Sequence, residues 1–183
     1  MKKALIKLIF LLIISTVLPS CFFFSSNYKD QLRSVSFWRA KVVVKPEGEL
    51  KRVVSRFKKN LLWPLKSYVI TSAFKRRGRR FHTGIDIDGY LGQDVYSAVN
   101  GEVWYTGYKR GYGRVVVIKH RNLYLLYAHL LRVKVWSGEQ VRKGEVIAEV
   151  GKSGNATGSH LHFETRVKIN KNYFILNPVL FYR

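Results

Sequence analysis

The chain carries five histidines, and four of them fall in three short segments. In the first segment, His82 stands four residues before Asp86. If residues 81–88 form one extended strand, successive side chains alternate between its two faces. His82, Asp86 and Asp88 then share a polar face, while the isoleucines between them face a core. On this interpretation, Gly84 leaves open the space between His82 and Asp86.

The second segment places His160, His162 and Glu164 at alternate positions. The same alternation puts these three side chains on one strand face and turns the apolar residues between them towards the core. The third segment, residues 127–130, ends an apolar run with His129. Any one of these motifs is weak, because histidines with a purely structural role are common. The complete set favours a metal site.

Zinc suits this inventory of imidazoles and carboxylates. It binds both groups in tetrahedral geometry, and a catalytic zinc keeps one position for water. Two histidines and one aspartate leave that position open, and zinc lowers the pKa of such a water to about 7. The remaining histidines suit proton transfer and oxyanion stabilisation. Cys21 is the only cysteine, which excludes a cysteine-rich metal site and an intramolecular disulfide.

Taken in order, these and other motifs resemble the M23 family of zinc metallopeptidases, of the lysostaphin and LytM type. The motifs that carry the resemblance are Trp63-Pro64, Ile70-Thr71-Ser72 with Phe74, His82-Thr83-Gly84-Ile85-Asp86, Gly101 with Val103, Tyr127-Ala128-His129-Leu130, Gly138 and Val141 with Gly144, Gly151–Gly154, Thr157–Glu164 and Asn177-Pro178.

The resemblance implies a role for five residues. His82, Asp86 and His162 would be the zinc ligands, and His129 and His160 would form the catalytic histidine pair. It also implies an antiparallel β-sheet core, a site in a groove between loops, and the peptide cross-links of peptidoglycan as substrate. Many envelope relatives of the NlpD and EnvC type have lost ligands and act by activating amidases. This chain keeps all five positions, which favours catalysis.

Three residues outside these five also have predicted roles. Glu164 is expected to hydrogen-bond a ligand histidine, because carboxylates of this kind fix imidazole tautomers. His120 ends a strand-like run without a pairing motif, so we expect a structural role for it. Lys75 stands where the family usually has glycine, which changes a loop rim but no ligand.

Residues 62–183 predict one β-rich peptidase domain, which makes the chain mainly β. Short strand-like runs alternate with glycine-containing turns, and their density favours a small antiparallel sheet assembly over βαβ units. We expect Leu130–Val135 to form a short turn or helix. The strand-like runs are Ser67–Ser72, Val95–Ala98, Gly101–Tyr108, Arg114–His120, Tyr124–His129, Val146–Val150 and His160–Val167.

Residues 41–60 predict a strand, a turn and then a helix. Val42–Val44 favour a strand, Pro46-Glu47-Gly48 a turn, and the apolar residues from Leu50 to Phe57 have helical spacing. This order resembles the first half of a LysM peptidoglycan-binding module, whose second half is missing here. The alternative, which we favour, is a short β-turn-α elaboration packed on the main domain.

The N-terminus reads as an export signal. Residues 1–20 combine a basic start with an apolar run that is too short to span a bilayer, as in signal peptides. Leu18-Pro19-Ser20-Cys21 resembles a bacterial lipobox, which would make Cys21 a lipidated first residue and residues 21–40 a lipid-anchored tether. The alternatives are ordinary cleavage nearby or an uncleaved anchor. We expect an exported lipoprotein of the cell envelope.

The strongly basic composition implies an anionic partner. The 183-residue chain has 33 Lys and Arg against 11 Asp and Glu, a net charge of +22. The densest cluster is Lys75–Arg80. Nucleic acid is not an expected partner, because no nucleic-acid motif accompanies the cluster and the export signal removes the protein from the genome. Anionic wall polymers or lipid headgroups are the expected contacts.

These observations predict an exported zinc endopeptidase that hydrolyses peptidoglycan cross-links, with Zn²⁺ as cofactor. Its expected partners are peptidoglycan peptide stems and, through Cys21, a membrane. The alternative is a non-enzymatic activator of a cell-wall amidase or a peptidoglycan-binding regulator.

Overall fold

The computed structural model describes residues 35–182. The predicted signal peptide, Cys21 and most of the predicted tether lie outside the described residues. Residues 35–38 are helical and belong to a unit that ends at Arg39, and a second compact unit begins at Ala40. None of the helices in residues 35–182 has the length and apolarity that a membrane crossing requires.

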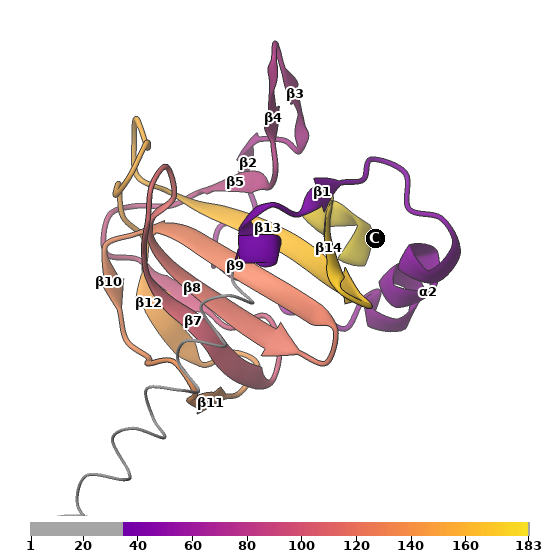
Figure 1. Ribbon diagram of the computed structural model, residues 1–183. Coiled ribbons are helices and arrows are strands. Elements are labelled where there is room, and N and C mark those ends of the chain that lie inside the picture. Colours follow the sequence, from indigo (N-terminus) through magenta and orange to yellow (C-terminus); the bar gives the residue numbers. More distant parts are fainter. Residues whose placement is uncertain (1–34, 183) are drawn as a thin grey trace, which may run out of the picture. The chain divides into compact units, whose positions relative to one another are not determined.

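The second unit is built around one large sheet (Figure 1). Its strands are β1 (Lys41–Val42), β2 (Ile70–Ser72), β5 (Ile85–Asp88), β7 (Gly101–Lys109), β8 (Gly113–His120), β9 (Leu123–Leu130), β11 (Gln140–Val141), β13 (His160–Ile169) and β14 (Asn172–Leu176). They follow the order β1-β14-β13-β9-β8-β7-β11, with β5 also paired to β13 and β2 paired to β5. Only β1 and β14 pair in parallel among these described strands.

Two smaller sheets complete the strands. β10 (Arg132–Val133), β12 (Val146–Glu149) and β6 (Asp94–Tyr96) form one of them in that order. β3 (Lys75–Arg77) and β4 (Arg80–His82) form a separate hairpin. A 3₁₀ turn, η1 (Pro178–Phe181), follows β14, with the Asn177 side chain accepting a hydrogen bond from the Val179 N–H. The mainly antiparallel β fold predicted from the sequence is confirmed.

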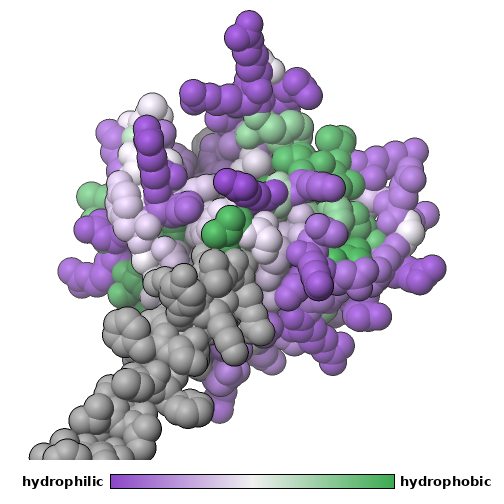
Figure 2. All heavy atoms as spheres, in the orientation of Figure 1, coloured by the Kyte–Doolittle hydropathy of each residue, from purple (hydrophilic) through white to green (hydrophobic). Residues whose placement is uncertain are grey.

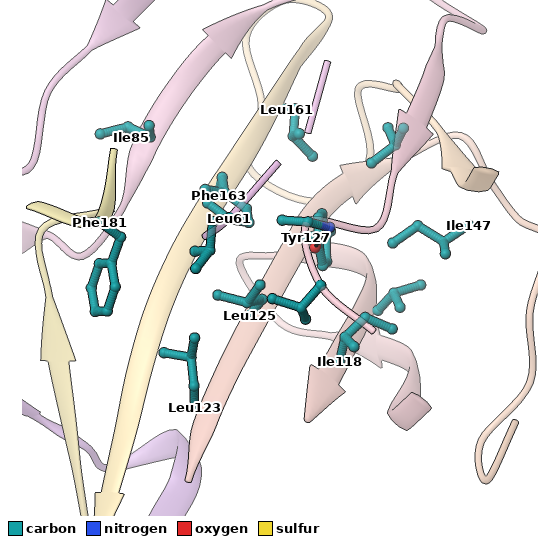
Figure 3. Packing of buried hydrophobic residues seen from close by; sticks show 14 of the residues in the cluster. Leu61, Ile85, Ile118, Leu123, Leu125, Tyr127, Ile147, Leu161, Phe163 and Phe181 are labelled. Atoms are coloured by element: carbon teal, nitrogen blue, oxygen red, sulfur yellow. Dashed lines mark hydrogen bonds between the residues drawn. The ribbon is translucent and has the colours of Figure 1, made fainter. Parts of the chain in front are cut away.

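The hydrophobic core lies against one face of the large sheet. Alternate residues of β9, Leu123, Leu125 and Tyr127, belong to it, and Leu161 and Phe163 join it from β13 (Figure 3). Alternation along the strands turns these side chains to one face. The hydroxyl of Tyr127 accepts a hydrogen bond from a backbone N–H at 2.9 Å, so this polar tip is paired inside the core.

The segment 41–60 is part of this unit. β1 pairs with β14, and helix α2 (Gly48–Phe57) buries Leu50, Val53 and Phe57 in the same hydrophobic cluster as the sheet. The helix ends where Lys59 adopts a left-handed φ of 62°. Its apolar stripe therefore faces the main core.

The prediction of a turn or helix at Leu130–Val135 was wrong. Leu130 ends β9, and β10 pairs antiparallel with β12. The N–H groups of Leu131 and Lys134 donate to carbonyls of Glu149 and Ile147, each at 2.9 Å. Pairing with a neighbouring strand thus satisfies these backbone groups, and tertiary context overrides the local pattern.

Residues 81–88 form two strands, where the sequence suggested one. β4 ends at His82, and β5 begins at Ile85. The alternation expected for β5 is present, since Ile85 and Ile87 are fully buried. A Cβ on Gly84 would lie 2.4 Å from the carbonyl oxygen of Phe163. Close approach to the backbone of β13 requires this glycine, and a Cβ would also lie 2.9 Å from His162 Cε1 and from Glu164 Cγ. The three nearest atoms thus belong to β13, whereas the sequence suggested space between His82 and Asp86.

Replacing Gly84 by alanine is expected to lower the free energy of unfolding by about 1–3 kcal/mol or more, because the β13 backbone has to move to admit a methyl group. Urea denaturation of the metal-free protein measures this effect. Gly158→Ala is the matched control, since a Cβ at Gly158 meets no atom within 4 Å. Equal stability of the two variants would contradict this account of the packing.

Candidate metal centre

The pairing of β5 with β13 brings predicted ligands together. His162 lies directly opposite Asp86 in the antiparallel register. Directly opposed residues on neighbouring strands project to the same side of the sheet, so their side chains meet. His82 reaches the same point from the end of β4. Three separate stretches of backbone thus supply the three predicted ligands.

Each of the three side chains offers one donor atom to a common point. His82 Nε2 lies 3.0 Å from Asp86 Oδ1 and 3.1 Å from His162 Nδ1. His162 Nδ1 lies 2.8 Å from Asp86 Oδ1. One small cation can contact all three corners of such a triangle at about 2.0–2.2 Å. The Asp86 side chain is 14% exposed, so the group is not sealed from solvent.

Hydrogen bonds on the far side of each ring fix which nitrogen faces this point. His82 Nδ1 donates to the carbonyl oxygen of Ala73 at 2.8 Å. His162 Nε2 lies 3.1 Å from Glu164 Oε1 and donates to that carboxylate. In a neutral imidazole only one nitrogen carries hydrogen. The lone pairs of His82 Nε2 and His162 Nδ1 therefore point towards each other and towards Asp86.

Such an arrangement fits a zinc ion. Two lone pairs and a carboxylate oxygen at about 3 Å repel one another unless a proton or a cation lies between them. Mixed nitrogen and oxygen donors suit Zn²⁺, whereas Mg²⁺ and Ca²⁺ prefer oxygen ligands alone. His82, Asp86 and His162 are therefore the residues that would hold zinc.

Without a cation, a proton satisfies this group. Burial acts to lower the pKa of His162, but hydrogen bonds and charges from Asp86 and Glu164 raise it to about 9. Burial acts to raise the pKa of Asp86, but hydrogen bonds from His162 and His82 outweigh it and hold the pKa well below its usual range. The metal-free site therefore carries a proton at neutral pH.

His129 and His160 stand beside the three donors. Their ring centroids are 4.8 Å apart, and His160 Nε2 lies 3.7 Å from Asp86 Oδ1. His129 Nδ1 donates to the Ser153 carbonyl at 2.8 Å, and His160 Nδ1 donates to the Gly158 carbonyl at 3.0 Å. Both rings thus have Nε2 as the nitrogen without a backbone partner.

His129 has a strained backbone and a shifted pKa. Its φ is 61°, a conformation uncommon outside glycine, and its N–H donates to the Tyr112 carbonyl at 2.9 Å. Burial and the charges of His162 and His160 lower its pKa to about 4, although its bond to Ser153 opposes the shift. His129 is therefore a neutral imidazole at neutral pH.

A buried network supports His162 from behind. Glu164, which accepts from His162, is also bonded to Thr83 and to the Tyr112 hydroxyl at 2.9 Å. Its other oxygen accepts from Arg166 Nε at 2.7 Å. Burial acts to raise the pKa of Glu164, but the Arg166 charge and the His162 bond lower it to about 2. The predicted contact of Glu164 with a candidate ligand histidine is present, at His162.

Sequence reasoning missed Arg166, Thr83 and Arg77 at this site. Arg166 is 1% exposed and continues the alternation of His160, His162 and Glu164 along β13, a signal present in the sequence. Arg77 Nη2 lies 3.5 Å from Asp86 Oδ2, a contact that depends on the β3–β4 hairpin.

His120 lies outside the cluster. Its Nδ1 donates to the Asn100 carbonyl at 2.6 Å, and its ring packs edge-on against Phe57 at 5.6 Å between centroids. These contacts are structural, as expected from the sequence.

Zinc has to displace the proton that His162 carries in the metal-free protein. Because the pKa of His162 is about 9 there, we expect release of about one proton per zinc at neutral pH, with apparent affinity rising nearly tenfold per pH unit until about pH 9. Titration calorimetry in buffers of different ionisation enthalpy counts the proton. An affinity that stays constant from about pH 7 to pH 9 would contradict the expectation.

Glu164→Gln is expected to weaken zinc binding by about 10–100-fold, because it removes the charge that orients His162 and leaves Arg166 buried without its carboxylate. Competition with a chromogenic chelator measures the affinity. Glu149→Gln is the control, since Glu149 pairs with Lys134 at 3.1 Å in a different ion pair. Wild-type affinity in both variants would contradict the role given to Glu164.

Comparison with known proteins finds similar sequences. The chain is 45% identical over 101 residues to the DD-carboxypeptidase/endopeptidase Mpg of Neisseria meningitidis, covering 55% of this chain and 22% of the relative. It is 38% identical over 108 residues to the murein hydrolase activator NlpD of Escherichia coli, covering 58% of this chain and 28% of the relative. Both matches leave most of the relative's length unmatched.

The fold of this chain is similar to solved structures of other proteins. The catalytic domain of the prophage-encoded M23 protein EnpA from Enterococcus faecalis, solved as a point mutant, is 30% identical with a TM-score of 0.58, over 68% of this chain and 96% of that chain. Lysostaphin from Staphylococcus simulans shares the fold with a TM-score of 0.52 at 24% identity, over 57% of this chain and 45% of that chain.

The family model described as Peptidase family M23 matches residues 80–174. This match spans more than half of the chain and contains the three candidate ligands together with His129 and His160. The structural likeness to EnpA, over 68% of this chain, agrees with it. The chain belongs to peptidase family M23.

Proposed function

We propose that this protein is an exported zinc endopeptidase that hydrolyses the peptide cross-links of peptidoglycan. The observation that carries the proposal is the convergence of His82, Asp86 and His162 on one point beside the imidazoles of His129 and His160. Three ligands leave one zinc position for water, as hydrolytic zinc sites require. The Mpg relative, named as an endopeptidase, supports the same chemistry.

Zinc, when bound here, would supply a water acidic enough to ionise near neutral pH and an electrophile for the scissile carbonyl. His129 and His160 then manage the protons at Nε2, because the Nδ1–H of each is held by a backbone carbonyl. A neutral Nε2 accepts the proton of the attacking water. The resulting N–H donates first to the developing oxyanion and then to the leaving amine.

We also propose the location and partners predicted from the sequence. A lipid on Cys21 would hold the domain at a membrane of the cell envelope, and the peptide stems of peptidoglycan would be its substrate. A mature protein that begins at Cys21 would lose Lys2, Lys3 and Lys7 and keep a net charge of +19, which attracts anionic wall polymers over distances of about one Debye length. The NlpD relative, which is named as a murein hydrolase activator, supports a place of action at the cell wall.

A second function is supported by the same relative. NlpD is named as a murein hydrolase activator, which is the role of a regulator of other enzymes. The complete set of five site residues in this chain favours hydrolysis, since an activator does not need zinc ligands. Substitution of a ligand separates the two functions.

Purified zinc-loaded protein is expected to release peptide-containing fragments from isolated sacculi. Chelation of the zinc, or the substitution His162→Ala, is expected to lower the rate of release by more than about 1,000-fold. Mass spectrometry of the fragments identifies the bond that is cut. His120→Gln, which removes a histidine outside the site, is the control and should retain the wild-type rate. Equal release by all samples, or none from the zinc-loaded protein, would contradict hydrolysis.

In cells, His82→Ala distinguishes the hydrolase from the activator. If the protein is a hydrolase, the variant cannot correct the envelope defect of a deletion strain. If the protein is an activator, the variant still corrects it. Complementation of a deletion strain by the variant, at wild-type protein levels, would establish the second function in place of the first.

A further inference from the structure

The β3–β4 hairpin stands away from the sheet and is densely cationic. It lies at the top of Figure 1, and the same region is hydrophilic in Figure 2. Lys75, Arg76 and Arg77 form β3, Arg79 lies in the turn with Gly78, and Arg80 begins β4. The hairpin ends at His82, a candidate zinc ligand. A cationic surface is thus joined covalently to the metal centre.

The register of the hairpin sorts its cations into two faces. Lys75 lies opposite His82, and Arg77 lies opposite Arg80. Opposed residues of an antiparallel pair, and residues two apart on one strand, project to the same side. Lys75, Arg77 and Arg80 therefore share the face of the hairpin that carries His82, and we call these three residues the metal-side cations.

The other face of the hairpin is different. Arg76 lies opposite Phe81 in the register. The ring of Phe81 packs against Phe74 with centroids 4.8 Å apart, so this face is anchored to the domain by apolar contact. Arg76 offers the same charge as Arg77 on the same strand but from the opposite face.

Arg77 links the metal-side cations to the site. Its Nη2 lies 3.5 Å from Asp86 Oδ2 and also bonds to Ser72 Oγ. The first contact is at the limit of a hydrogen bond and uses a single nitrogen. The Arg77 side chain is 48% exposed. Its described contacts therefore leave most of the five guanidinium donors directed at solvent beside the metal centre.

A guanidinium in this position matches a carboxylate better than it matches a peptide bond. Arginine binds carboxylates through two parallel N–H bonds, and its charge adds nothing specific to recognition of a neutral amide. Among residues 35–182, Arg77 is the one metal-side cation with an acidic partner, so Lys75 and Arg80 add uncompensated positive charge to the same face of the hairpin. This face therefore favours a negatively charged substrate group close to the scissile bond.

We propose that Arg77, supported by Lys75 and Arg80, binds a free carboxylate of the substrate peptide adjacent to the bond that is cut. This inference rests on the proposed function and adds a substrate class to it. Peptides with a free carboxylate next to the cleavage site are good substrates, and peptides in which that group is amidated are poor ones.

The test compares two synthetic cross-linked peptides that differ only in a carboxylate or a carboxamide next to the scissile bond. For the zinc-loaded wild type, we expect kcat/KM for the carboxylate peptide to exceed that for the amide by about 10-fold or more, as charge-assisted hydrogen bonds provide. Arg77→Gln is expected to reduce this ratio to near one, and Arg77→Lys to restore part of it. Arg76→Gln removes the same charge from the opposite face and should keep the wild-type ratio.

Ratios separate substrate binding from a merely structural role. If Arg77 only orients Asp86, Arg77→Gln lowers both rates by the same factor, and the unchanged ratio overturns the proposal. The zinc content of every variant is also measured, because a substitution at Arg77 that disturbs Asp86 would lower zinc binding. An unchanged ratio together with weaker binding to inorganic polyphosphate or anionic vesicles would also overturn the proposal, in favour of polymer or lipid contact.

Binding distinguishes failure of this proposal from failure of the proposed function. Calorimetry with both peptides reports a preference for the carboxylate without any turnover. Preferential binding that Arg77→Gln abolishes, without hydrolysis of either peptide, would support the carboxylate site and contradict the hydrolase. Hydrolysis of both peptides without preference would contradict the carboxylate site alone.

Discussion

The register between β5 and β13 is the constraint on which the site depends. It sets His162 opposite Asp86 and, two residues along, His160 opposite Asp88. A shift of one residue would turn the histidines to the apolar face and the core residues to the polar one. The burial of Leu161 and Phe163 on one side therefore holds the candidate metal ligands on the other. Core packing and site geometry are two consequences of the same pairing.

The site buries more charged side chains than a protein interior ordinarily contains. Glu164 and Arg166 are both buried, and their pair is bonded to His162 and to the Tyr112 hydroxyl. Breaking such a pair costs several kcal/mol, because one charge is left without a partner. The network fixes the ring of His162, which is a candidate zinc ligand. Because a proton on His162 satisfies the cluster when no metal is bound, the arrangement of its donor atoms suits a cation at this point.

Much of the site follows from alternation along strands. The HxH pair, Glu164 and their apolar neighbours are placed correctly by a period of two, and β13 has this arrangement. The contacts that escaped prediction depend on the path of the backbone between elements. Thr83 and Gly84 break the segment that the sequence suggested as one strand, and the β3–β4 hairpin carries Arg77 to Asp86. The β10 strand was missed for a related reason, because its partner β12 is distant in sequence. The local sequence pattern predicts which side chains share a face of a strand, whereas turns and long-range strand pairing decide which of these faces come together.

X-ray absorption at the zinc K edge tests the central claim most directly. Protein loaded with one equivalent of zinc is expected to show four nitrogen or oxygen neighbours at about 2.0–2.1 Å, with scattering from two imidazole rings. His82→Ala should remove one of those rings from the spectrum. A spectrum without imidazole scattering, or one that His82→Ala leaves unchanged, would contradict a metal centre formed by His82, Asp86 and His162.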